Sequence, residues 1–364
     1  MKDLRVFIFQ QRNWGLNFGH TLAVYLKNNY NARFACFTQK KNVDLFVRNQ
    51  KEINYEHIIN YEDLLSRPSE NENYNPKLIE EFCDTTGVKS IWKFLLSDKL
   101  LTMNYSKKFH YSMFEKNVSN EYIKSFFCQL YLELKKIFTT FNPNIIIMPN
   151  MAGTSHVVTY YLAKKKNIKI ITVNDTKVAG IYSIVHDPNN SDGYFINHLK
   201  SSQNKKKNLK NLKLARKYIK ESRLSIKSFE YMDQVQPPIS LANLLKEIKN
   251  ILREMIAYII YNKSFKIHKI KGIGINHDYR PPKTLIRDFI SLTINKFKSM
   301  RIKYENIDGL KNFAYYPLQY QPEVTTELQG PWCANQFEII RMTALSLPAD
   351  MKLVVKEHPI MIGL

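Results

Sequence analysis

Cysteine is scarce in this chain, and its few cysteines are far apart. Cys36, Cys83, Cys128 and Cys333 are the only four among 364 residues, and no two of them form a C-x-x-C pair. This distribution is typical of reduced thiols in a cytosolic protein, and it argues against a disulfide framework or a zinc site. The acidic D-x-D pair that commonly clamps a metal and a diphosphate is also missing. We therefore expect no essential metal and no cofactor.

Long hydrophobic runs are missing as well. The longest candidate, residues 251–261, is interrupted by Arg253 and Glu254, so no stretch approaches the roughly 18 apolar residues that span a bilayer. The amino terminus, MKDLRVFIFQQ, contains a short apolar run without a cleavage site of small residues, which predicts a strand and not a signal peptide. The sequence therefore predicts a soluble, cytoplasmic protein.

The chain also contains few acidic residues relative to its basic ones. The chain has 54 Lys and Arg against 32 Asp and Glu, a net charge of +22. Residues 200–311 alone hold 26 Lys and Arg against 9 Asp and Glu, so 17 of the 22 excess charges lie in this basic segment. One interpretation is attraction to an anionic partner, and the other is an AT-rich codon bias, because Lys, Asn and Ile are all abundant. The segment has no recognisable RNA- or DNA-binding motif, so we expect no specific nucleic-acid partner.

The first 200 residues alternate short apolar runs with helical patterns. Strands separated by helices are typical of an α/β fold with a parallel sheet. We expect a loop over residues 11–19, between the first strand and the first helix. The expected strands are residues 5–10, 33–38, 144–148 and 168–173, and the expected helices are residues 20–28, 121–138 and 155–166.

The basic segment is predicted to be helical. A lysine-rich helix is expected over residues 205–224, and a second begins after Ser240, which can cap it. The second helix has a continuous apolar stripe, which we expect to face a core, with a helix lying on a membrane surface as the alternative. The stripe consists of Leu241, Leu244, Leu245, Ile248, Ile251, Leu252, Met255, Ile256, Ile259 and Ile260.

The alternation of strand and helix starts again near the carboxyl terminus. Residues 313–316 and 352–356 predict strands, and residues 335–347 predict the helix between them, which together form one βαβ unit. Because both strands of such a unit run the same way, the loops that follow them meet at the edge where α/β sheets bind ligands. The residues expected to converge there are Gln319, Gln321, Glu323, Glu357 and His358.

His358 is the residue of this group best suited to contact a phosphate. Pro359 restricts the backbone of His358 to an extended conformation, which holds the imidazole at the end of the strand. A histidine there can donate to a phosphate oxygen or, when charged, neutralise a leaving phosphate. For an isolated His-Pro pair, a histidine that merely caps a loop is the plainer interpretation.

This pair is not isolated, because a larger combination of segments surrounds it. The run FAYYPLQYQPE at residues 313–323, the pair Asn335-Gln336, the triplet at residues 346–348 and the run LVVKEHP at residues 353–359 together resemble the capsule polysaccharide biosynthesis family. That family includes Kdo transferases, and the resemblance covers about the last fifty residues. It implies two Rossmann-like domains of the GT-B type, with parallel sheets and the sugar nucleotide in the carboxyl-terminal half. Bacterial sialyltransferases of similar architecture hold the CMP phosphate with a His-Pro pair, which implies nucleotide contacts for His358 and Pro359.

The resemblance also implies a division into domains. We expect an acceptor-side Rossmann-like domain over residues 1–200, a basic helical connection over residues 201–310, and the start of a nucleotide-sugar-binding domain over residues 311–364. The sequence ends before the later segment of the family, so the last domain is expected to be incomplete. The acidic-acidic-Gly motif that supplies the base in the sialyltransferases has no full match in this sequence. Residues 191–193 and 307–309 match it only in part.

Candidate residues for the acceptor side lie near two predicted helix starts. Glycines let the backbone approach a ligand closely, and a helix amino terminus favours an anion, although a tight turn explains the glycines equally well. Transfer of a sugar also needs a base that takes the proton of the acceptor hydroxyl. We rank Glu323 first as this base and Asp175 second, and Asp187 is a further carboxylate near a strand end. The acceptor-side or anion-binding candidates are Gly15, Asn17, Gly19, His20, Thr154 and Ser155.

The sequence therefore favours a glycosyltransferase of capsule or surface-polysaccharide biosynthesis. The donor is expected to be a sugar nucleotide, with CMP-activated Kdo or a sialic-acid-like sugar favoured, and the acceptor a glycan or a glycolipid. An acidic acceptor, or peripheral contact with the anionic inner face of the cell membrane or with capsule-assembly proteins, would account for the basic segment. The alternatives are a UDP-sugar epimerase on the same fold and a non-catalytic factor for polysaccharide assembly or export.

Overall fold

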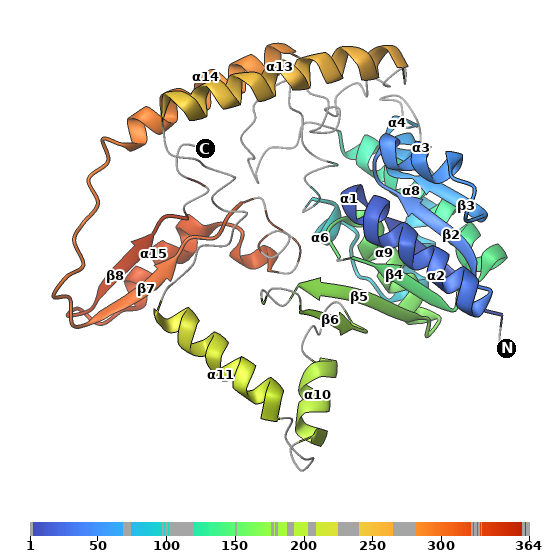
Figure 1. Cartoon of the computed structure of the whole chain (residues 1–364), viewed down its shortest axis with the longest axis horizontal. Coiled ribbons are helices and arrows are strands. Elements are labelled where there is room, and N and C mark those ends of the chain that lie inside the picture. The colour runs from blue at the N-terminus through green and yellow to red at the C-terminus, as the bar shows by residue number, and fades with distance from the viewer. Residues whose placement is uncertain are drawn as a thin grey trace. The chain divides into compact units, whose positions relative to one another are not determined.

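The computed structural model describes most of the chain as two compact units (Figure 1). The first unit contains the described residues of Met1–Phe195 and Pro322–Ala334, and the second those of Ile196–Lys266, Asp278–Gln321 and Asn335–Leu364. The domain boundaries expected at residues 200 and 310 stay a prediction. The described residues are 3–67, 74–96, 98, 101, 119–149, 151–175, 178, 181–187, 193–202, 209–224, 240–264, 282–321, 323, 326, 328, 330–358 and 361.

A six-stranded sheet, in the order β3-β2-β1-β4-β5-β6, forms the centre of the first unit. The first five strands in the chain pair in parallel, and the edge strand β6 pairs antiparallel with β5. The α/β class and the mostly parallel sheet predicted from the sequence are therefore confirmed. The strands are β1 (Arg5–Gln10), β2 (Arg33–Thr38), β3 (Tyr55–Asn60), β4 (Ile145–Met148), β5 (Lys169–Asp175) and β6 (Tyr182–Val185).

Helices cover both faces of this sheet, because alternate side chains of the strands are apolar on both sides. Phe7 and Phe9 of β1 belong to a cluster with residues of α4, α5, α6, α8 and α9, whereas Val6 and Ile8 belong to a cluster with residues of α2 and α3. Full burial of each such side chain contributes about 1.5–3 kcal/mol. The helices are α2 (His20–Tyr30), α3 (Lys41–Asn49), α4 (Tyr61–Ser66), α5 (Pro76–Thr86), α6 (Trp92–Leu95), α8 (Asn120–Lys136) and α9 (Thr154–Lys165).

The second unit contains a smaller parallel sheet and a set of helices. β7 (Phe313–Pro317) pairs with β8 (Lys352–Lys356), with Phe313 opposite Lys352 and Pro317 opposite Lys356, and α15 (Gln336–Ser346) connects them. The strand, helix and parallel strand expected here are confirmed. The other helices are α10 (Gly193–Ser202), which begins at the end of the first unit, α11 (Leu209–Leu224), α13 (Leu241–Ser264) and α14 (Pro282–Ser299).

α13 and α14 pack side by side (Figure 1). Lys296, near the end of α14, places its Nζ 3.3 Å from Oε1 of Glu247, near the start of α13, so the two helices run antiparallel. The apolar stripe of α13 does not face a core, because Leu245 and Ile256 each remain 59% exposed. Among the helices that the structure describes, none is both long and apolar enough to cross a bilayer.

Candidate functional site

The connections out of the six-stranded sheet define a switch point between β1 and β4. β1 continues through α2 to β2 on one side, whereas β4 continues through α9 to β5 on the other side. The segments that leave the carboxyl ends of β1 and β4 therefore diverge, and ligands of open α/β sheets bind at such a point. Four polar residues gather here, and we call Gln11, Asp98, Thr154 and His156 the switch-point cluster.

His156 is the most perturbed titratable group of the switch-point cluster. It lies in the first turn of α9, is 2% exposed, and stacks on the ring of Phe9 with a centroid distance of 4.6 Å. Burial lowers the pKa of His156 to about 3, and the nearby backbone of Gly153 has a smaller, raising effect. The imidazole is therefore neutral at physiological pH.

The contact between Gln11 and His156 determines which ring nitrogen carries the proton. The side-chain amide nitrogen of Gln11 lies against Nε2 of His156. An amide N–H can only donate, so with the amide in this orientation Nε2 accepts and the proton of the neutral ring is on Nδ1. His156 thus presents a buried N–H donor at Nδ1, and a neutral Nδ1–H cannot take a proton from a substrate. The residue is suited to hold a group and not to act as a base.

Asp98 occupies the amino terminus of α9. Its Oδ2 accepts from the amide of Thr154 at 2.8 Å and from the hydroxyl of Tyr61 at 3.4 Å. A Cβ on Gly153 would lie 3.1 Å from the same oxygen, so glycine at this position leaves room for the carboxylate. Burial, followed by the charge of Asp98, raises the pKa of Tyr61 well above its usual range. A carboxylate of the chain itself therefore lies at this helix start, and the anion-binding role expected for Thr154 and Ser155 stays a prediction.

Three buried polar atoms of α9 have no hydrogen-bond partner among the described residues: Oγ1 of Thr154, Nδ1 of His156 and Oγ1 of Thr159. Buried polar groups are almost always paired, and an unpaired one costs about 1–3 kcal/mol. All three groups are neutral, and the nearby carboxylate of Asp98 would repel a phosphate. This set suits water or the hydroxyl groups of a neutral ligand.

The glycines after β1 pack against their own strand. Residues 11–19 were expected to form a loop, but α1 (Arg12–Trp14) and a π-helical turn, η1 (Gly15–Gly19), continue directly into α2, so that prediction is wrong. A Cβ on Gly15 would lie 2.7 Å from the carbonyl carbon of Gln10, and one on Gly19 would lie 2.5 Å from the ring of Trp14. The glycines permit this close packing, and the tight-turn explanation fits them better than an open cradle for a ligand.

The other acceptor-side candidates lie around this turn. Asn17 is exposed, and its carbonyl accepts from the hydroxyl of Thr21 at 2.7 Å. His20 is 8% exposed and packs against Phe46 of α3, with its Nε2 2.7 Å from Oε2 of Glu52. Ser155 is buried beside Thr154 in the first turn of α9. Their roles in binding stay predictions.

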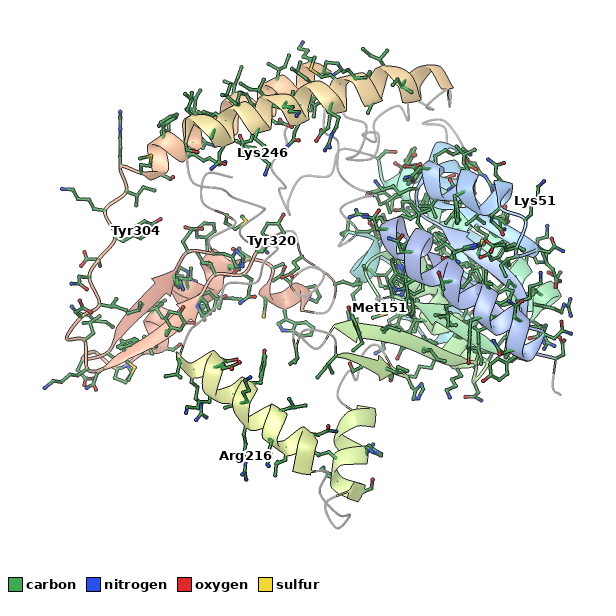
Figure 2. All side chains as sticks on the ribbon, in the orientation of Figure 1. Lys51, Met151, Arg216, Lys246, Tyr304 and Tyr320 are labelled. Atoms are coloured by element: carbon green, nitrogen blue, oxygen red, sulfur yellow. The ribbon has the colours of Figure 1, made fainter. Side chains whose placement is uncertain are left out.

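In the second unit, the segments that follow β7 and β8 meet at the carboxyl edge, as the sequence predicted. The amide of Leu318 donates to the carbonyl of Lys356 at 2.9 Å. The ring of Tyr320 lies 6.0 Å from the ring of His358, centroid to centroid, at an interplanar angle of 45°. Figure 2 shows Tyr320 in the segment that follows β7. We call this region the β7–β8 edge.

Gln336, the first residue of α15, holds the backbone of the β7–β8 edge. Its Oε1 accepts from the amide of Gln319 at 2.6 Å, and its Nε2 donates to the carbonyl of the same residue at 3.0 Å. Asn335 caps the helix, because its Oδ1 accepts from the amide of Glu338 at 3.2 Å. The Asn335-Gln336 pair quoted for the family resemblance therefore fixes both the helix start and the neighbouring loop.

The predicted nucleotide contacts belong to the second unit, whereas the predicted bases belong to the first. Gln319 is exposed, Gln321, Glu357 and His358 are half-buried, and Pro359 lies outside the described residues. Glu323 is an exposed residue of the first unit, where its carbonyl accepts from the amide of Thr326 at 3.2 Å. Asp175 ends β5 opposite Tyr182. Asp187, also considered, accepts from the hydroxyl of Tyr160 at 3.0 Å.

Three members of the switch-point cluster, Gln11, Asp98 and His156, were not predicted from the sequence. His156 has a local signal, because it is a histidine directly before the mostly apolar part of a helix that packs on the sheet. Gln11 directly follows a buried strand, which places it at a ligand-binding edge. Asp98 has no such signal, because it reaches Thr154 across 56 residues of sequence.

Compared with known protein families, with characterised proteins and with solved structures, the chain matches none. Within the described ranges, no group of three or more His, Cys, Asp or Glu side chains is arranged to hold a metal ion.

Proposed function

We propose that this protein is a glycosyltransferase of the GT-B type that acts in the assembly of capsule or a related surface polysaccharide. It takes a sugar from a sugar nucleotide, with CMP favoured, and transfers it to a glycan or lipid-linked acceptor. The observation that carries the proposal is the β7–β8 edge, where Tyr320 and His358 come together from two segments that contain the family-like motifs. The mostly parallel sheet of the first unit and the parallel strand pair of the second are consistent with this fold type.

The β7–β8 edge is the proposed nucleotide site. A protonated His358 would donate to the phosphate of the nucleotide and stabilise its charge as it leaves. The ring of Tyr320 lies beside the imidazole. Gln336 holds Gln319, so the backbone of the loop is in place before the nucleotide binds. Such preorganisation lowers the entropy lost on binding.

The switch-point cluster is the proposed acceptor side. Its unpaired groups are neutral, and hydroxyl groups of a sugar can both donate to and accept from them. A carboxylate, Glu323 or Asp175, would take the proton of the attacking hydroxyl, whose oxygen then bonds to the anomeric carbon of the donor. The bond from that carbon to the phosphate breaks at the same time, and the nucleotide leaves with the electron pair.

Thermal unfolding of the full chain with CMP, UDP or GDP tests the nucleotide site. We expect CMP to raise the unfolding midpoint, and we expect the rise to disappear in His358→Ala. His198→Ala, which removes an exposed histidine of α10, is the matched control and should retain the rise. Indifference of the folded protein to all three nucleotides would refute the proposal, and glycan binding without donor hydrolysis would point to a non-catalytic assembly factor.

A further inference from the structure

α13 and α14 together expose two apolar stripes, and we call this pair the amphipathic hairpin. On α13 exposed apolar residues recur every three or four positions from Leu241 to Ile259, Ile260 is exposed as well, and the exposed fractions range from 42% at Ile248 to 76% at Leu241. Those of α14 are 45–50% exposed. Apolar surface on this scale marks an interaction site. The stripes consist of Leu241, Leu245, Ile248, Leu252, Ile256 and Ile259 on α13, and of Ile286, Ile290, Ile294 and Phe297 on α14.

The charges of the hairpin are segregated between its exposed and covered sides. Lys246, Lys249 and Arg253 of α13 are all exposed, whereas Glu247 and Glu254 are half-buried. At 100° per residue, the three cations lie along one border of the apolar stripe, and both glutamates lie on the opposite side of the helix. Figure 2 shows the side chains of α13, with Lys246 labelled.

α14 follows the same arrangement. Its acidic residue, Asp288, is 5% exposed and lies 2.7 Å from the guanidinium of Arg287. Lys283 and Lys298 are exposed. In the described parts of the two helices, no acidic residue is exposed. The exposed side of the hairpin is therefore apolar and positively charged at once.

We infer that the amphipathic hairpin docks on the surface of an anionic lipid bilayer, with both helices lying in the plane of the interface. An apolar stripe bordered by lysine and arginine is the pattern of interfacial helices, whose apolar residues enter the acyl boundary while the cations contact anionic headgroups. Neither helix is apolar enough to cross the bilayer. A second copy of the hairpin is a poorer partner, because it would bring cations against cations with no exposed acid between them.

This inference goes beyond the proposed transfer reaction and does not depend on it. The donor chemistry rests on the β7–β8 edge, whereas the docking surface rests on α13 and α14 alone. If both hold, the hairpin brings the enzyme to the surface from which a lipid-linked acceptor projects. Loss of membrane binding would then leave nucleotide binding intact, so the two ideas fail separately.

Flotation of the full chain with vesicles tests the docking surface. We expect the protein to float with vesicles of phosphatidylcholine and phosphatidylglycerol at low salt, and to remain unbound with phosphatidylcholine alone. The triple variant Lys246→Gln, Lys249→Gln, Arg253→Gln should bind about 100-fold more weakly, because each cation near an anionic surface strengthens binding by a factor of about five. The matched control neutralises three exposed lysines of the first unit, Lys51, Lys77 and Lys165, and should bind as the original protein does.

A second variant separates the apolar contribution from charge. Leu245→Gln with Leu252→Gln and Ile256→Gln keeps the net charge and uses a good helix former at exposed positions, so the fold is retained and circular dichroism checks it. We expect this variant to bind anionic vesicles at least tenfold more weakly. We also expect 0.5 M salt to weaken the binding of the original protein to these vesicles. Equal binding to neutral and anionic vesicles would overturn the inference. The inference would also be overturned if the protein bound no vesicles and instead formed a dimer that dissociates in the apolar variant.

Discussion

Replacing His156 with glutamine tests how the first unit depends on pH. His156 is buried in the first turn of α9, and burial lowers its pKa to about 3 in the folded protein, against about 6.5 in an unfolded chain. Acid therefore protonates this residue more readily in the unfolded state. Its contribution to stability is fully present above about pH 6.5 and is lost progressively as the pH falls toward about 3.

The size of this effect follows from the two pKa values. Between pH 7 and pH 5 the unfolded histidine gains most of a proton and the folded one gains almost none, which destabilises the protein by about 2 kcal/mol. Glutamine does not titrate, and it retains an amide that can pair with Gln11. We therefore expect the free energy of unfolding to fall about 2 kcal/mol more in the original protein than in His156→Gln over this range.

Urea unfolding at pH 7, 6 and 5, followed by circular dichroism, measures the difference. The remaining histidines are present in both proteins, including His20 beside Glu52, so their contributions cancel in the comparison. The full difference should accumulate below pH 6.5 and be small between pH 7 and pH 8. Parallel pH dependence in the two proteins would mean that His156 is hydrated or already charged in the folded state, and the account of the switch-point cluster would be wrong.

Two further predictions concern the same region of the sheet. Asp98→Ala should lower the free energy of unfolding by about 3 kcal/mol, because the amide of Thr154 and the hydroxyl of Tyr61 lose a charged acceptor. The control is Asp84→Ala, which removes an exposed carboxylate and should change the free energy of unfolding by less than about 0.5 kcal/mol. Gly19→Ala should cost about 1–3 kcal/mol, because its Cβ would overlap the ring of Trp14. Urea unfolding measures both, and a neutral effect of either substitution would contradict the packing described.

The strands that the sequence predicted are those with continuous apolar runs. β1, β2 and β4 are buried on both faces, so apolar residues fill nearly every position and the runs are easy to recognise. β3 was missed because Glu56 and His57 interrupt its apolar pattern. The edge strand β6 was missed because it has only four residues and is exposed at Tyr182. Neighbours in the sheet, and not local sequence, determine these two strands.

Other differences between the predicted and the observed structure arise because hydrophobic periodicity shows which residues share a helix face, and it does not show what covers that face. The stripe of α13 was identified residue by residue, yet its exposure depends on which other elements pack there. The turn after β1 was expected to be a loop because glycines favour turns, whereas Gly15 and Gly19 are needed so that a helical turn can approach Gln10 and Trp14. The meeting of Tyr320 and His358 could be predicted, because parallel strands fix where their following loops emerge.

The two hydrogen bonds between the side chain of Gln336 and the backbone of Gln319 connect a helix to a loop. The side chain of Gln336 pairs with both the amide and the carbonyl of Gln319, so the first turn of α15 and the segment after β7 are held together. A displacement of α15 would therefore also move the segment that contains Tyr320, whose ring lies beside that of His358.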